Sequence, residues 1–195
     1  TKNILEGFKK QEIEYQNTPK SVSSLDRVVK PNILKDFPQI NFDELTAMAE
    51  NAINLYYTSL EKGKLQKISN ASDNLNNKIN TKIEESKQNN DTYKMLKIHQ
   101  TVINSYSNSK GSCIITFQTS LEYLKNGEKE QERLNTDLIY VYDETDVKDT
   151  YGVSLNCKNC GGPIKNLGDK VCPYCGTGVV EYTSKVWKVN DIYEK

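Results

Sequence analysis

Hydrophobic residues recur at helical spacing along the segment that follows Pro38. Asn41 can cap the start of this helix, and Glu44 three residues later completes a capping-box arrangement. Gly63 is a typical residue for the end of a helix. The pattern predicts a helix of about 20 residues whose apolar face packs against a broad surface such as a sheet. Its apolar positions are Phe42, Leu45, Met48, Ala49, Ala52, Leu55, Tyr56 and Leu60.

The next periodic segments predict a second helix over 72–87 and then a run of strands. From Tyr93 the apolar period changes to two, which is typical of strands. Asn126-Gly127 is a strong turn pattern between two strands. We therefore expect helices first and an antiparallel meander after them, which is an α+β fold. After the strand that starts at Tyr93, the expected strands cover 114–121, 134–142 and 186–189.

The first thirty residues have the pattern of a linker or tether. A short stripe of Ile4, Leu5, Phe8 and Tyr15 is followed by polar segments that interrupt it. Two interpretations stay open: a linker that carries a frayed helix end, and the end of an amphipathic membrane or partner segment. We expect the packed domain over 31–150 plus 183–195, with a separate cysteine module over 151–182.

Composition and charge narrow the classes of partner. The chain has 26 basic and 26 acidic residues, and Arg27 and Arg133 are its only arginines. Nucleic-acid binders usually carry a basic excess and use arginine for bidentate contacts, so the composition argues against nucleic acid. No apolar stretch is long enough for a transmembrane helix, and no signal peptide is recognisable. Because the chain starts at Thr1, we expect that a missing upstream region could carry a membrane anchor.

The strongest chemical pattern is a pair of Cys-x-x-Cys motifs, each followed by glycine. Two residues between the cysteines let a tight turn direct both sulfurs at one ion, and four thiolates form a closed tetrahedral zinc site. We therefore predict one structural zinc ion. Two disulfides and an iron–sulfur cluster are the alternatives. Thiolates suit a reducing compartment, so we expect a cytoplasmic protein. The predicted ligands are Cys157, Cys160, Cys172 and Cys175.

The remaining reactive residues do not form a catalytic set in the sequence. His99 is the only histidine, and alternation along its strand places it on the opposite side from Tyr106. Cys113 is most simply a small buried hydrophobe. Glu128, Glu130 and Glu132 next to a turn have the pattern of a solvated strand end. We therefore expect that the protein is not an enzyme.

Two segments carry a resemblance to a known family. The first runs from Pro31 to Ile68 and contains Phe37-Pro38 and Phe42-Asp43, and the second is VWKVNDI, with Trp187, Asp191 and Ile192. Together they resemble a bacterial member of the family named for the forty-four-kilodalton subunit of the mitochondrial inner-membrane translocase. The resemblance covers residues 31–150 and 183–195. It implies the cone-shaped fold of nuclear transport factor two, with a zinc ribbon inserted before the last strand.

The resemblance also implies a role. Mitochondrial members are membrane-proximal scaffolds that bind acidic phospholipid at a cone pocket, so we expect a binding or scaffold module with a protein partner or membrane lipid. The chain would then act at the inner face of the cell membrane. The alternatives are a small-molecule or lipid-binding pocket protein, or an enzyme that uses the cone pocket. Aromatic candidates for the pocket lining, unless they simply fill the core, are Tyr56, Tyr57, Tyr106, Phe117, Tyr123 and Trp187.

Overall fold

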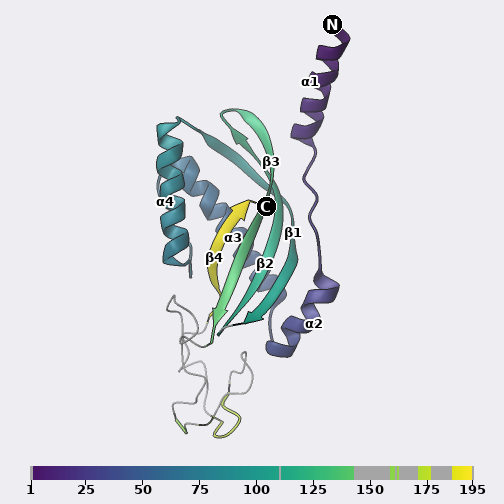
Figure 1. Cartoon of the computed structure of the whole chain (residues 1–195). Helices are drawn as coiled ribbons and strands as arrows, with labels where there is room; N and C mark the ends of the chain where they lie inside the picture. Colours follow the sequence, from purple (N-terminus) through teal and green to yellow (C-terminus); the bar gives the residue numbers. More distant parts are fainter. Residues whose placement is uncertain are drawn as a thin grey trace.

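The structure is a computed structural model that describes residues 2–109, 111–142, 159–160, 162, 171–176 and 186–194. Within these residues the chain forms four helices and one four-stranded antiparallel sheet of order β1-β2-β3-β4, which confirms the predicted α+β class (Figure 1). The helices are α1 (Lys2–Asn17), α2 (Asp26–Asp36), α3 (Phe42–Lys62) and α4 (Asp73–Gln88). The strands are β1 (Tyr93–Ser109), β2 (Ser112–Lys125), β3 (Glu128–Val141) and β4 (Lys188–Glu194).

Helix α3 begins and ends where the sequence predicts. The Asn41 side chain accepts hydrogen bonds from the backbone N–H groups of Asp43 and Glu44, at 3.1 and 3.2 Å. At the other end Gly63 adopts the left-handed conformation, with φ of 60°, which suits a residue without a side chain. Helix α4 also agrees with its predicted range and is capped by the Ser72 side chain.

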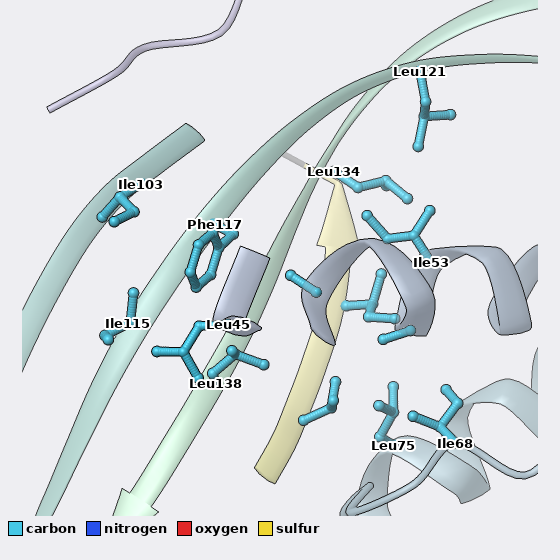
Figure 2. Packing of buried hydrophobic residues seen from close by; sticks show 14 of the residues in the cluster. Leu45, Ile53, Ile68, Leu75, Ile103, Ile115, Phe117, Leu121, Leu134 and Leu138 are labelled. Atoms are coloured by element: carbon cyan, nitrogen blue, oxygen red, sulfur yellow. The ribbon is translucent and has the colours of Figure 1, made fainter. Parts of the chain in front are cut away.

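The hydrophobic core lies between α3, α4 and the concave face of the sheet (Figure 2). Phe117 and Ile115 of β2 and Leu138 of β3 are fully buried. Ile53 of α3 and Leu75 of α4 are fully buried as well. Helix α3 packs on the strands, and α4 packs on α3 and β4. Because successive side chains of a strand alternate between its faces, only every second residue of β2 and β3 faces this core.

Strand β3 starts at Glu128, earlier than the expected residue 134. Asn126 and Gly127 have φ values of 54° and 84°, so they form a tight two-residue turn with positive φ at both positions. This turn pairs Lys125 directly with Glu128 and draws the charged residues that follow into the ladder. Strand β4 starts later than expected, at Lys188, and continues to Glu194, beyond the expected end at residue 189.

The packed part of the chain starts before residue 30, although the sequence pattern suggests a linker there. Helix α2 contains Pro31 in its interior, and buried Val29 and Ile33 hold it on the sheet. The sequence pattern misses α2 because a proline usually ends a helix rather than lying inside it. Before α2, the backbone N–H of Leu25 donates to the carbonyl of Ile103 of β1, at 3.0 Å.

Helix α1 projects from the body of the molecule (Figure 1). Its C-terminal end contacts β3 through polar groups: Gln131 donates to the carbonyl of Gln16, and Lys129 donates to Asn17, at 2.9 and 3.1 Å. The expected apolar stripe is exposed, with 65 % of Phe8 accessible. Among the described residues, no helix combines the length and apolar character needed to cross a membrane.

Candidate functional site

Three of the four predicted metal ligands lie close together. The sulfur atoms of Cys160, Cys172 and Cys175 all lie within 4.8 Å of one another. Cys172 is 2 % exposed, whereas Cys160 and Cys175 are exposed. Cys157, the fourth predicted ligand, lies outside the described residues. The described cysteines could therefore hold a metal ion.

The spacing of two of the sulfurs is too long for a disulfide between them. The Sγ atoms of Cys160 and Cys172 are 3.7 Å apart. In a tetrahedral zinc site with Zn–S bonds of about 2.3 Å, neighbouring sulfurs are about 3.8 Å apart. A disulfide would bring them to about 2.05 Å. The observed separation matches the edge of a zinc–thiolate tetrahedron.

Local turns place these sulfurs. In the second motif the backbone N–H of Gly176 donates to the carbonyl of Cys172 at 3.0 Å, and Gly176 has φ of 72°. The left-handed conformation lets the chain leave the turn without a side-chain clash. The two motifs are also in contact, because the side-chain amide of Asn159 in the first motif donates to Sγ of Cys175 in the second at 3.7 Å.

Gly162 leaves no room for a side chain next to the sulfurs. A Cβ atom at this position would lie 2.8 Å from Cδ2 of Tyr174 and 3.3 Å from Sγ of Cys160. We predict that Gly162→Ala weakens zinc binding by about tenfold. This is the size of effect that follows when a group that orients a metal ligand is lost. Competition with a chromophoric chelator measures this change.

The double variant Gly162→Ala with Tyr174→Ala is the matched control for this prediction. Removing the ring relieves the closest contact, so the double variant should recover most of the lost affinity relative to Gly162→Ala. Equal zinc affinities for the wild type and Gly162→Ala would show that this close approach does not position Cys160.

The six aromatic pocket candidates separate into two groups. The first group, Tyr56, Tyr57 and Tyr123, gathers between α3 and the turn end of β2, with the rings of Tyr57 and Tyr123 4.8 Å apart. In the second group, Phe117 is fully buried in the core, and the Trp187 ring packs 5.4 Å from that of Tyr140. Tyr106, also in this group, donates through its hydroxyl to Asp36.

Two members of the first group border a cleft of about 380 Å³ between α3, α4, β3 and the end of β4. Tyr56 and Tyr57 line it from α3, and Tyr193 lines it from β4. The carboxyl groups of Glu132 and Glu194 face the same cleft. The sequence does not predict a role for these two glutamates.

Glu132 is half-buried and hydrogen-bonded, in contrast to the solvated strand end that the sequence suggests. The hydroxyl of Tyr57 donates to its carboxylate. Burial raises the pKa of Glu132, the Tyr57 hydrogen bond opposes this effect, and the nearby charge of Glu194 raises the pKa further. The strand register set by the Asn126-Gly127 turn could have predicted that Glu132 faces the core side of the sheet, because it pairs Glu132 with core residue Leu121.

His99 does not take part in this cleft. Its Nε2 atom lies 3.3 Å from Oε1 of Gln131 and 3.6 Å from the carboxylate of Glu122. Gln131 and Glu122 are the strand neighbours of Glu132 and Leu121, so they project from the convex face of the sheet. Tyr106 contacts Cys113 on the helical side, as expected from the sequence. The two residues therefore do not form an acid–base pair.

No protein-family model matches the chain, and no curated protein sequence matches it. The geometry of the described residues therefore carries the functional argument. It offers two features of different chemistry: the cysteine cluster, and the cleft that contains Tyr57 and Glu132.

Proposed function

We propose that the chain is a non-enzymatic binding or scaffold module that carries one structural zinc ion. Cys157, Cys160, Cys172 and Cys175 would bind the metal. The observation that carries this proposal is the 3.7 Å separation of the Cys160 and Cys172 sulfurs, which suits thiolates that share one ion. When bound, the zinc supplies cross-links that hold a short segment in one conformation.

A four-thiolate site favours a structural role over catalysis. Four cysteines fill the tetrahedron and leave no position for water or substrate. The same segment presents apolar side chains to solvent, since Val171 is 54 % and Tyr174 is 55 % exposed. A metal-stabilised segment with exposed apolar side chains is suited to docking against another protein.

We further propose the cone-shaped fold of nuclear transport factor two and membership of the translocase-subunit family. The element order supports this part: two helices cover the concave face of an antiparallel sheet, and the last strand follows the cysteine segment. This module would act next to a membrane. The exposed apolar residues of α1, such as Leu5 and Phe8, support contact with a partner or a lipid surface.

Native mass spectrometry of the purified chain, compared with its denatured mass, tests the proposal. We expect one zinc ion for each chain in the native state. A retained protein partner would support the scaffold role, and a retained lipid-sized molecule would support the pocket alternative. A metal-free chain whose mass is lowered by the hydrogens lost in two disulfides would contradict the zinc site and its reducing compartment.

A further inference from the structure

The cleft between α3, α4, β3 and the end of β4 has aromatic walls. The rings of Tyr56 and Tyr57 lie 5.2 Å apart and nearly perpendicular, and Tyr193 contributes a third ring from β4. Faces of aromatic rings attract cations through the ring quadrupole. The cleft already shows this preference, because Nζ of Lys78 lies 5.9 Å from the centre of the Tyr193 ring.

The basic residues of the cleft already have anionic partners. Nζ of Lys78 lies 2.7 Å from the carboxylate of Asp191 and also donates to the carbonyl of Ile192 at 2.8 Å. Nζ of Lys82 lies 3.6 Å from the carboxylate of Glu85. Within the cleft these contacts leave little positive charge to neutralise the other acids. The remaining basic residues near Glu132 and Glu194 line an adjoining cavity instead, and they are Lys20, Lys125 and Arg133.

Glu132 and Glu194 are the acids that remain. Within the described part of the chain, neither forms an ion pair with a lysine, arginine or histidine. Glu132 is half-buried, and Glu194 raises its pKa through its charge and through a hydrogen bond between the two carboxyl groups. Such a bond needs a shared proton, and a bound cation would take the place of that proton and let both groups be charged.

We propose that this cleft binds a small organic molecule through its ammonium group, which would lie between Glu132 and Glu194 and against the tyrosine rings. Ammonium hydrogens donate to carboxylates in strong, charge-assisted hydrogen bonds. The same carboxylates repel an anion, so the cleft disfavours the acidic phospholipid implied by the family resemblance. The site does not involve the cysteines, so a test of one proposal leaves the other intact.

A divalent metal ion suits the cleft less well. Among the described residues, the cysteine cluster is the one group in which three potential metal ligands converge. Calcium and magnesium need six or more oxygen ligands, and the cleft gathers only the carboxylates of Glu132 and Glu194 without a basic partner. An ammonium group needs fewer contacts because it carries its own hydrogen-bond donors.

Three probes of one shape test the proposal by nuclear magnetic resonance on the zinc-loaded chain. Benzylammonium is cationic, benzyl alcohol is neutral and benzoate is anionic. We expect benzylammonium to shift the backbone amide signals of Glu132, Leu134 and Ile192 with a millimolar dissociation constant, as suits a fragment of this size. Benzyl alcohol and benzoate should bind at least about tenfold more weakly.

Matched variants locate the site. Glu132→Gln removes the charge but keeps an acceptor for the Tyr57 hydroxyl, and it should weaken benzylammonium binding by about tenfold. Glu194→Gln is a second variant at an exposed position, where a folding defect is not expected. Glu128→Gln, an exposed residue at the start of the same strand, should leave binding unchanged.

Several outcomes would overturn the proposal. One is the absence of amide shifts at ~50 mM benzylammonium, a concentration well above a millimolar dissociation constant. Another is equal binding of benzyl alcohol, which would show that the site does not recognise charge. Shifts of the same amides with benzoate, or with vesicles of acidic phospholipid, would instead show that the cleft accepts anions. Loss of binding in Glu128→Gln but not in Glu132→Gln or Glu194→Gln would place the cation elsewhere.

Discussion

Cys172→Ser should release the zinc ion and unfold the cysteine segment, while the helices and the sheet stay folded. Cys172 is 2 % exposed, and its sulfur lies 3.7 Å from that of Cys160. A serine hydroxyl does not replace a thiolate ligand, so the loss of zinc affinity should exceed the roughly 10–100-fold that follows loss of an outer-shell partner. Chelator competition measures the affinity, and Trp187 fluorescence follows the folded domain.

Cys113→Ser is the matched control, because Cys113 is buried in the domain core and contacts Tyr106 rather than the other cysteines. It should keep its zinc and lower the free energy of unfolding by about 1–3 kcal/mol, since the smaller serine side chain loses buried contacts of the sulfur and must bury a hydroxyl. The two variants should thus affect different properties. Loss of cooperative unfolding of the whole chain in Cys172→Ser would show that the segment is integral to the core.

Phe117→Ala should lower the free energy of unfolding by about 3–5 kcal/mol, the range for removal of a large buried aromatic side chain. Phe117 is fully buried on the inner strand β2, where it faces α3. The net free energy of unfolding of a domain is only about 5–15 kcal/mol, so this loss should bring the variant close to unfolding. Urea denaturation followed by circular dichroism measures the change.

Phe8→Ala provides the comparison at an exposed phenylalanine. Phe8 is 65 % accessible on α1, so its truncation should change the free energy of unfolding by less than about 0.5 kcal/mol. An equal loss in both variants would mean that the stripe on α1 packs as firmly as the core. A small loss in Phe117→Ala would mean that the sheet and α3 close the cavity.

The sequence predicts elements well where local chemistry determines them. Asn41 and Gly63 fix the ends of α3 through contacts within a few residues, and Asn126-Gly127 fixes the β2–β3 turn. Helix α2 could not be predicted in this way, because burial of Ile33 against the sheet outweighs the cost of Pro31. Tertiary packing decides that element, and no local pattern encodes it.

The candidate sites show the same division. Cysteine spacing within the sequence predicts the cysteine cluster because the cysteines of each motif are neighbours in the chain. The cleft joins Tyr57 and Glu132, which are far apart in sequence, and its recognition needs the strand register. Register shifts also interrupt β1 near His99, so simple alternation does not describe that strand throughout.

The pairing of β3 with β4 has a consequence for the segment that joins them. Ile139 pairs with Lys188 and Leu138 pairs with Val189, so the chain leaves the sheet and returns to it at adjacent strands. The entropy cost of closing such a loop grows by only about 0.6 kcal/mol for each doubling of its length. The sheet therefore tolerates added length between β3 and β4 at a small entropic cost, so insertions into the intervening segment should leave the strand register unchanged.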